Sequence, residues 1–365
     1  MALKCGIVGL PNVGKSTLFN CLSSAKAQSA NFPFCTIEPN VGIITVPDKR
    51  LQALSDHVKP EKIVPTTVEI VDIAGLVKGA SKGEGLGNKF LGNIRECDAI
   101  IHVLRCFEDG NIVHVDGSVD PVRDKEVIDI ELQFKDLEAI EKNLEKARKM
   151  ARTGDKTFKR AVEILEQYQK HLEEGKSARS LVLDDKSREL VGDMMLLTEK
   201  PVLYVCNVDE ASALSGNDFT KKVEELVADE SCEVIYLCAA VESDIAEFED
   251  YEEKQMFLEE MGLSEPGVNT LIGSAYKLLN LETYFTAGVK EVRAWTIKRG
   301  MSAPQAAGVI HTDFEKGFIR AEVIKYSDFV ELGSESACRD AGKLHVEGKE
   351  YIVEDGDVMH FRFNV

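Results

Sequence analysis

Apolar runs separated by mixed polar segments form the main pattern along this chain. Runs made mostly of apolar or β-branched residues occur at residues 5–8, 66–72, 99–107, 201–206 and 234–238. Runs without polar alternation are typical of parallel strands that helices cover on both faces. Because a helical pattern follows the first run, the chain is predicted to begin an α/β fold with a mostly parallel sheet.

Between residues 124 and 200 the pattern becomes that of long helices. Apolar residues recur at steps of three and four over 130–151, among Glu and Lys, and again over 158–172. The break at Thr153–Asp155 contains a glycine. Two helices with narrow apolar stripes around a glycine turn predict an antiparallel coiled-coil hairpin. Its charged faces fit simple solvation, and a projecting hairpin also fits a contact arm.

The strand pattern resumes after the hairpin, which is therefore predicted to be an insertion. We expect one α/β domain at 1–124 and 201–280, an inserted coiled-coil helical domain at 125–200, and a third domain at 281–365. The strand-like runs of this last segment are shorter, and they occur at 292–297, 318–324 and 357–363. Such short runs predict a compact α+β module.

Composition and charge exclude several classes of protein. The 365 residues are 44% hydrophobic and carry a net charge of −19. This charge disfavours indiscriminate binding to phosphate backbones, so any RNA contact must come from a local patch. The nine cysteines are scattered and form no C-x-x-C pair, which argues against a disulfide framework or a zinc site. Since no leader-like or membrane-spanning apolar segment is present, we expect a cytoplasmic protein.

The strongest motif follows the first apolar run directly, where Gly9–Ser16 reads G-x-x-x-x-G-K-S. The two glycines let backbone N–H groups face a common centre, where phosphate oxygens bind. Lys15 is expected to reach the β- and γ-phosphates and to act in catalysis, and the Ser16 hydroxyl to bind Mg²⁺. The residues expected to hold the nucleotide here are Asn12, Val13, Gly14, Lys15, Ser16 and Thr17.

Two further loops are expected to contact Mg²⁺ and the γ-phosphate. Thr36 lies in a proline-containing loop at 29–40 and is a candidate Mg²⁺ ligand; the alternative is an ordinary surface threonine. Asp72 ends a β-branched run and begins D-x-x-G, so its carboxylate is expected to hold Mg²⁺ through water. The Gly75 amide is expected to approach the γ-phosphate. Leu76 occupies the place of the water-orienting glutamine of Ras-type switches.

The base-recognition motif departs from the N-K-x-D of GTPases. At the end of the fourth strand-like run the chain reads Asn207-Val208-Asp209-Glu210. Asn207 is expected to brace the phosphate loop, whereas Val208 replaces the lysine and Glu210 replaces the aspartate. A displaced, longer carboxylate loses the two-point contact with guanine on which discrimination depends. Ala240, in a small-residue loop after the last strand of the sheet, is expected beside the base.

Segments along essentially the whole chain resemble the YchF-type, Obg-related P-loop ATPases. The resembling segments are Gly9–Thr17, Asn31–Asn40, Asp72–Val77, Thr283–Gly288 and His311–Phe318. The resemblance implies a P-loop NTPase G domain with an inserted α-helical coiled-coil hairpin. It also implies that residues 281–365 form a TGS domain, which has a ubiquitin-like β-grasp fold.

The same resemblance implies a function. Members of this family use ATP in preference to GTP, carry an apolar residue at the position of Leu76, and associate with ribosomes. His114 aligns with a histidine proposed to assist hydrolysis, although a lone histidine is more often structural. Asn12 stands where related P-loop enzymes hold a monovalent cation. K⁺ is therefore a candidate second cofactor beside Mg²⁺; the alternative is that Asn12 only shapes the loop.

Three functional hypotheses follow. The preferred one is a Mg²⁺-dependent, ATP-hydrolysing switch that binds the large ribosomal subunit or the whole 70S particle and modulates translation or a stress response. Its RNA contacts would run through the TGS domain and the hairpin, without a membrane partner. The first alternative is an Obg-type GTPase, which competition between ATP and GTP would distinguish. The second is a nucleotide-gated RNA or ribosome adaptor, in which a lysine substitution abolishes hydrolysis while partner binding survives.

Overall fold

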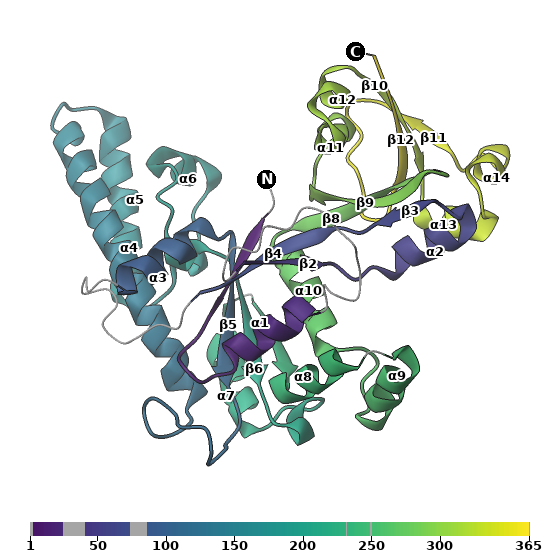
Figure 1. Cartoon of the computed structure of the whole chain (residues 1–365). Coiled ribbons are helices and arrows are strands. Elements are labelled where there is room, and N and C mark those ends of the chain that lie inside the picture. Colours follow the sequence, from purple (N-terminus) through teal and green to yellow (C-terminus); the bar gives the residue numbers. More distant parts are fainter. Residues whose placement is uncertain (1–2, 25–40, 74–85, 231, 249, 365) are drawn as a thin grey trace. The chain divides into compact units, whose positions relative to one another are not determined.

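The computed structural model describes residues 3–24, 41–73, 86–230, 232–248 and 250–364 (Figure 1). The chain divides into two compact units. The first unit contains the described residues up to Gly42 and those from Glu69 to Val268, and the second contains Ile43–Val68 and the residues from Asn269 onward. Each unit has its own sheet.

A six-stranded sheet with the strand order β2-β4-β1-β5-β6-β7 organises the first unit. The strands are β1 (Lys4–Val8), β2 (Val41–Thr45), β4 (Thr67–Asp72), β5 (Ala99–Arg105), β6 (Val202–Asn207) and β7 (Glu233–Leu237). β1 pairs in parallel with β4 and β5, and β6 pairs in parallel with β5 and β7. Every residue of β5 and β6 is buried. The predicted α/β fold with a mostly parallel sheet is confirmed.

Three helices connect strands of this sheet: α1 (Lys15–Ser24), α3 (Leu86–Glu96) and α7 (Asp218–Val227). After β7 come α8 (Ala239–Glu247), α9 (Tyr251–Glu260) and α10 (Gly267–Leu278), and the first unit ends at Val268 in the first turn of α10. Local signals fix their ends: the Asn217 side chain accepts from the backbone N–H groups of Phe219 and Thr220 in a capping box on α7. The Glu242 carboxylate likewise accepts from the N–H of Gly267 at 2.7 Å and starts α10.

A long helical hairpin lies between β5 and β6, and its helices run side by side (Figure 1). It consists of α4 (Pro121–Ala151) and α5 (Lys156–Glu173), followed by α6 (Asp185–Val191) and two single-turn helices at Ala178–Ser180 and Leu197–Glu199. Its core contains Ile140, Ile164, Tyr168 and Leu172. α4 begins four residues before the expected boundary at 125, because Asp120 caps it and Pro121 suits a first helical turn.

A buried polar cluster attaches the base of α4 to the sheet. The Lys125 ammonium lies 2.6 Å from an Asp129 oxygen and 2.7 Å from a Glu230 oxygen. The Tyr204 hydroxyl on β6 donates to the other oxygen of Glu230 at 2.8 Å. Burial alone would lower the pKa of Lys125, but the two carboxylates outweigh it and raise this pKa. The first turns of the hairpin therefore share a charged network with the sheet.

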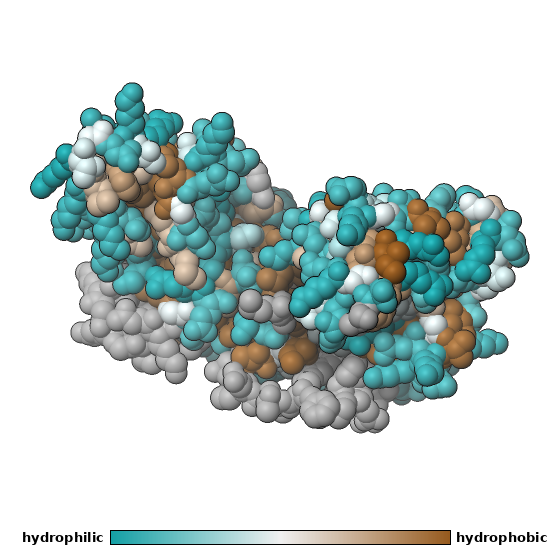
Figure 2. Space-filling view, turned by 90° about the horizontal axis from the view of Figure 1, so that it is seen from above, coloured by the Kyte–Doolittle hydropathy of each residue, from teal (hydrophilic) through white to brown (hydrophobic). Residues whose placement is uncertain are grey.

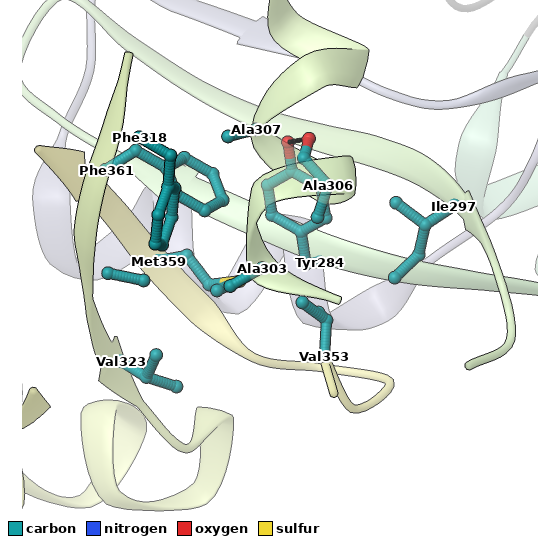
Figure 3. Packing of buried hydrophobic residues seen from close by; sticks show 11 residues of the cluster. Tyr284, Ile297, Ala303, Ala306, Ala307, Phe318, Val323, Val353, Met359 and Phe361 are labelled. Carbon is teal, nitrogen blue, oxygen red and sulfur yellow. Dashed lines mark hydrogen bonds between the residues drawn. The ribbon is translucent and has the colours of Figure 1, made fainter. Parts of the chain in front are cut away.

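The second unit is a mixed sheet with the strand order β11-β10-β12-β8-β9-β3. Its strands are β3 (Lys62–Val64), β8 (Leu281–Ala287), β9 (Glu291–Lys298), β10 (Phe318–Ile324), β11 (His345–Glu347) and β12 (Val358–Phe363). Its helices are α2 (Lys49–Val58), α11 (Ala303–Ile310), α12 (Thr312–Lys316), α13 (Tyr326–Leu332) and α14 (Glu335–Asp340). Tyr284, Phe318 and Phe361 pack with the alanines of α11 to form its core (Figure 3).

The compact units do not coincide with the domains expected from the sequence. Leu51 and Leu54 of α2 pack with Phe285 and Phe329, although residues 43–68 were expected to belong to the α/β domain. β3 also pairs in parallel with β9. The module at 281–365 thus needs an earlier segment of chain to complete its sheet and core. Its TGS character stays a prediction.

One face of the molecule is drawn by hydropathy in Figure 2. In the view of Figure 2, hydrophilic residues cover most of the surface, and hydrophobic residues are exposed in small groups. Within the described ranges, no helix is long and apolar enough to cross a membrane.

Candidate nucleotide-binding site

The loop between β1 and α1 has a backbone that only glycine can adopt at two positions. Gly14 has φ +97°, and a Cβ atom there would collide with the side-chain nitrogen of Asn207. A Cβ atom at Gly9 would lie 2.5 Å from the carbonyl oxygen of Val103. The Leu18 N–H then donates to the Gly14 oxygen at 3.0 Å and starts α1. The two glycines of the motif are thus explained by close neighbours on β5 and at the end of β6.

Asn207 joins the phosphate loop to the loop that follows β7. Its Nδ2 donates to the Val13 carbonyl oxygen at 2.9 Å, and its Oδ1 accepts from the Ala239 N–H at 3.0 Å. The side chain is buried and satisfied at both ends. This is the geometry expected of a bracing residue, and it brings the three loops at the carboxyl edge of the sheet together.

Lys15 lies buried within the loop that it follows. Its ammonium donates to the Leu10 carbonyl oxygen at 2.6 Å. Burial lowers the pKa of Lys15 from 10.5 to about 8, against an opposing attraction from Asp72. A cation held in a desolvated loop by the Leu10 carbonyl is well placed to exchange that partner for phosphate oxygens.

Asp72, at the carboxyl end of β4, carries a buried oxygen that fits a metal site. Burial raises the pKa of Asp72, with the Lys15 charge opposing. Its Oδ1 has no hydrogen-bond partner among the described residues. Such an orphaned carboxylate oxygen suits the water shell of Mg²⁺. Ser16 lies in the first turn of α1 and is exposed. Thr36, Gly75 and Leu76 lie outside the described residues.

The residues that follow Asn207 form the side of the site expected to receive the base. Val208 is buried, and its N–H donates to the Leu237 carbonyl oxygen at 3.0 Å. The Asp209 side chain is occupied, because it accepts from the Ser212 N–H at 3.0 Å. Glu210 and Ala240 are exposed. Of the two carboxylates after Asn207, one therefore caps a short helix and the other faces solvent.

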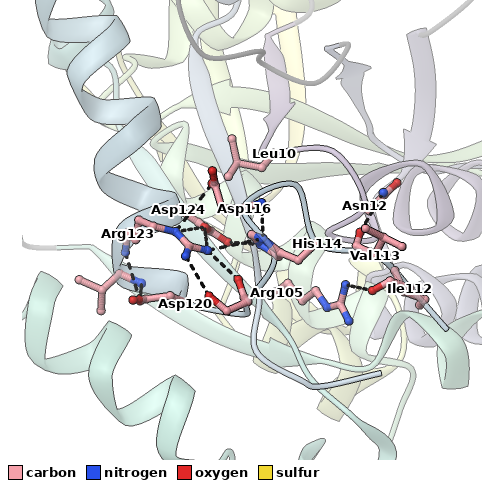
Figure 4. Close-up of polar contacts among 12 residues, drawn as sticks. Leu10, Asn12, Arg105, Ile112, Val113, His114, Asp116, Asp120, Arg123 and Asp124 are labelled. Atoms are coloured by element: carbon pink, nitrogen blue, oxygen red, sulfur yellow. Dashed lines mark hydrogen bonds and ion pairs between the residues drawn. The ribbon is translucent and has the colours of Figure 1, made fainter. Parts of the chain in front are cut away.

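A buried arginine, which sequence reasoning missed, organises the loop after β5. The guanidinium of Arg105 donates to three loop carbonyls, those of Phe107, Asp109 and Ile112, at 3.0–3.3 Å. Asn12, with φ +62°, donates from Nδ2 to the Val113 carbonyl oxygen at 3.1 Å (Figure 4). This loop is thus tied to the phosphate loop. An arginine at the end of a strand that is apolar except for His102 was the signal in the sequence.

His114 lies in the same loop and is held against the start of α4 (Figure 4). Its Nε2 is 2.8 Å from the Asp124 Oδ2, and its Nδ1 accepts from the Asp116 N–H at 3.2 Å. Arg123 binds the second oxygen of Asp124 at 3.0 Å. Neither Asp124 nor Arg123 was expected from the sequence.

These groups resemble a metal site but already contain a cation. One ligand atom each of His114, Asp116 and Asp124 lies within 4.8 Å of the others. The Arg123 guanidinium supplies positive charge to both carboxylates, at 3.0 Å from Asp124 and 3.8 Å from Asp116. We therefore describe them as an ion-pair network around His114.

Two family models match the chain. The model described as 50S ribosome-binding GTPase matches residues 4–152. The model for the C-terminal region of YchF-type GTPases, described as a protein of unknown function, matches residues 281–364. The first match contains the phosphate loop and the His114 loop, and the second contains most of the second unit.

Curated relatives match over their whole length. The chain is 56% identical to the ribosome-binding ATPase YchF of Haemophilus influenzae over 365 residues, which is 100% of both chains. It is also 56% identical to the protein of that name from Bacillus subtilis over 367 residues, again 100% of both. The solved structure of the Schizosaccharomyces pombe YchF GTPase superposes with a TM-score of 0.89 at 40% identity, covering 99% of this chain and 97% of that chain.

Proposed function

This chain belongs to the YchF family of P-loop nucleoside triphosphatases, and from that premise we propose that it is a Mg²⁺-dependent, ATP-hydrolysing switch that binds the ribosome. One observation supports the proposal most directly. Asn207 joins the phosphate loop, with its buried Lys15, to the loops expected to receive the base. A nucleoside triphosphate is the ligand whose parts match these neighbouring features.

ATP preference is the part of the proposal that rests on the base side of the site. A guanine contact of the N-K-x-D type needs a carboxylate that meets two N–H donors at once. Here Asp209 is occupied by Ser212, Glu210 is exposed, and the lysine position holds the buried Val208. Adenine would instead be recognised by loop backbone near Val208 and Ala240.

Competition binding tests this preference. We expect the wild-type chain to bind ATP and ADP more tightly than GTP and GDP. The double substitution Val208→Lys with Glu210→Asp should shift the preference toward GTP by about 1–3 kcal/mol, if the two-point contact is restored. Lys15→Ala should lose affinity for both triphosphates and serves as the control for site-specific binding. Equal affinities for ATP and GTP in the wild type would favour the Obg-type GTPase.

We assign Mg²⁺ to Ser16, Asp72 and Thr36. When bound, the ion neutralises phosphate charge in the transition state. The protein's own part is to hold Lys15 against the phosphates and to present the unpartnered Asp72 oxygen. Ser16→Ala is expected to raise the Mg²⁺ concentration needed for half-maximal ATP binding. An unchanged requirement would remove Ser16 from the site.

K⁺ is assigned to Asn12. The Asn12 amide nitrogen is occupied by Val113, which orients the side chain beside the phosphate loop. An amide oxygen is a suitable ligand for a monovalent cation, and added positive charge would compensate for the missing glutamine at Leu76. Turnover should then be faster in K⁺ than in Na⁺ at equal ionic strength. Equal turnover would leave Asn12 with a structural role only.

The ribosome contact is assigned to the turn end of the helical hairpin. We define this hairpin tip as residues 142–160, which contain eight basic and two acidic side chains in a chain of net charge −19. All ten are exposed. Within the described residues only Arg148 and Arg160 of the eight form an ion pair, with Glu166 and Glu163. A local patch of positive charge, most of it outside ion pairs among the described residues, fits the phosphate backbone of RNA.

Charge removal at the hairpin tip tests this assignment in the full chain. Lys146, Lys149 and Lys156 would be replaced together by glutamine, and ribosome binding measured at several salt concentrations. We expect weaker binding and a salt dependence reduced by about two to three counterions. The matched control replaces Lys186, Lys221 and Lys222, which are equally exposed but lie on α6 and α7. The same loss in both variants would make the effect one of net charge, and no loss in either would place the contact elsewhere.

The adaptor hypothesis remains the second candidate, because both ring nitrogens of His114, the candidate group for assisting hydrolysis, are occupied by other contacts. Its test is a variant that still binds the ribosome but does not hydrolyse ATP. If Lys15→Ala abolishes ATP turnover while nucleotide-independent ribosome binding and cellular function persist, hydrolysis is incidental.

A further inference from the structure

His114 is held by a contact that connects two elements of the first unit. The Asp124 carboxylate comes from the first turn of α4, whereas His114 belongs to the loop after β5. Both side chains are almost completely buried, with 3% of the His114 and 1% of the Asp124 side chain exposed. At 2.8 Å, the contact of the imidazole with Asp124 is shorter than its contacts with the Asp116 N–H and the Arg123 guanidinium.

The hydrogen bonds fix which ring nitrogen carries the proton. A backbone N–H can only donate, so Nδ1, which receives the Asp116 N–H at 3.2 Å, is an acceptor. The Arg123 guanidinium, another donor, lies 3.5 Å from the same nitrogen. The ring proton therefore lies on Nε2 and is donated to Asp124 at 2.8 Å. Both ring nitrogens are occupied, and neither is free to bind a water molecule.

We propose that Asp124 is a positioning residue. Its hydrogen bond with the His114 ring keeps this histidine from taking part in ATP hydrolysis until a movement of helix α4 breaks the bond. The proposal rests on the proposed ATPase function, in which His114 is the candidate group for holding the attacking water. The Asp116 contact is made within the loop and moves with it. The Asp124 contact comes from another element, α4, and it is the shorter of the two contacts that α4 makes with the His114 ring. It must break when the ring moves toward the phosphates, together with the Arg123 contacts to the loop at Ser118 and Asp116.

The network gives the released ring a defined character. Because the Asp116 amide remains on Nδ1, the group that becomes available is the Nε2 proton. His114 would then act as a hydrogen-bond donor toward the oxygen of water or phosphate, and not as a base that removes a proton. Arg123 stays paired with the Asp124 carboxylate at 3.0 Å, so the carboxylate left behind is not without a partner.

The position of Asp124 explains how a distant contact would reach the site. α4 extends from Pro121 to Ala151 and carries part of the hairpin tip at its far end. Its first turn holds His114 through Asp124, and the next residue, Lys125, belongs to the charged cluster on the sheet. A partner that tilts or shifts this helix would strain the His114 contact directly.

Removal of the Asp124 carboxylate tests the proposal in the full chain. We expect Asp124→Ala to raise the basal kcat for ATP about three- to tenfold, with KM unchanged, because His114 no longer has to leave a charged partner. Stimulation by purified ribosomes should fall by a similar factor. In the double variant with His114→Ala the increase should disappear. Asp124→Asn, which keeps the shape of the side chain, should give a smaller increase.

Glu126→Gln is the matched control. Glu126 is an exposed carboxylate on the same turns of α4, and it has no contact with His114. Its kcat should equal that of the wild type. A kcat in Asp124→Asn or Asp124→Ala that stays the same, or falls to the level of His114→Ala, would overturn the proposal, because Asp124 would then be neutral or would assist the histidine.

A second readout separates positioning from general damage and does not depend on turnover. Nitrogen chemical shifts of labelled histidine, assigned with His114→Ala, report which ring nitrogen carries the proton. We expect a single Nε2–H form in the wild type and in Glu126→Gln, and a mixture of forms in Asp124→Ala. A mixture in the wild type would refute the holding contact even if ATP is hydrolysed. A single form in a chain without ATPase activity would leave the contact intact and reject the proposed function.

Discussion

At the scale of single residues, burial decides the chemistry of Lys15. Its ammonium is enclosed by the loop that it serves, and its pKa is lowered to about 8. Between this value and its ordinary value of 10.5, the unfolded chain holds a proton that the folded chain does not. Lys15 alone therefore makes the free energy of unfolding rise with pH across this window. The same depressed pKa determines how nucleotide binding depends on pH.

We expect ATP binding to take up protons at Lys15. Phosphate oxygens favour the charged ammonium, so about half a proton should be absorbed per ATP at pH 8, and about a tenth at pH 7. Calorimetry in two buffers with different ionisation enthalpies measures this uptake. Lys15→Arg is the control, because a guanidinium does not titrate in this range and should show no uptake. An equal uptake at both pH values in the wild type would contradict the lowered pKa.

Asn207 supports a second prediction at this scale. Asn207→Ala leaves the Val13 carbonyl and the Ala239 N–H without their partner. We expect a loss of about 2–4 kcal/mol in the free energy of unfolding, because both groups are buried or nearly so. Affinity for ATP should fall as well. Asn207→Asp tests the donor alone, since it keeps an acceptor for Ala239 but loses the donor for Val13. A variant as stable as the wild type would show that the loops hold together without this side chain.

The residues of the phosphate loop could be predicted, and those around His114 could not. At Gly9 and Gly14 the backbone leaves room for a single residue type, so the requirement appears in the sequence at a fixed spacing. The contact between His114 and Asp124 depends instead on the angle at which α4 leaves the sheet. No local pattern records that angle, and Asp124 reads as an ordinary acidic residue in the first turn of a helix.

At the scale of elements, α4 connects the hairpin to both the sheet and the His114 loop. The part of α4 from residue 130 to 151 and most of α5 followed from apolar periodicity, which is a local property. Its attachment did not, because Lys125 finds its second carboxylate, Glu230, more than a hundred positions away in the chain. Charged residues near the start of a helix give no sign of being buried.

Lys125→Met tests the attachment of α4. It leaves the partly buried Asp129 and Glu230 without their shared cation, although Arg179 stays 3.8 Å from Glu230, and this should cost about 1.5–3 kcal/mol of unfolding free energy. Urea unfolding followed by circular dichroism measures this loss. Lys142→Met, on the same helix but exposed, should change stability by less than about 0.5 kcal/mol. Equal stabilities for the two variants would show that the cluster contributes nothing to the hairpin base.

At the scale of the whole molecule, the second unit is built from two distant parts of the chain. Leu54 of α2 has no exposed surface and packs in the same cluster as Phe285 and Phe329. The sequence predicted three strands of this unit, β9, β10 and β12, because each appears as an apolar run within one continuous segment. The inclusion of residues 43–68 in this unit was not predicted. β3 and β9 pair in parallel, so no short hairpin turn joins them and indicates the pairing in the sequence.

The single tryptophan, Trp295 on β9, makes this organisation testable. We expect Leu54→Ala to lower the free energy of unfolding, measured by Trp295 fluorescence, by about 2–5 kcal/mol. Ile140→Ala, in the core of the hairpin, should leave the transition measured by Trp295 fluorescence unchanged. It should shift the unfolding transition measured by circular dichroism to lower denaturant concentration. A Trp295 transition that ignores Leu54→Ala would show that the C-terminal segment is stable without α2.

The discontinuous second unit also affects how the protein is made. Val64 ends β3, whereas its partner strand β9 begins at Glu291, so roughly 230 residues of synthesis separate the two strands. At about 5–20 residues per second, α2 and β3 emerge some 10–50 s before the strands that cover them exist. During that interval their apolar side chains have no native neighbours. Chaperone binding to nascent chains should therefore be strongest while this early segment is exposed, and it should end only when the last strands leave the ribosome.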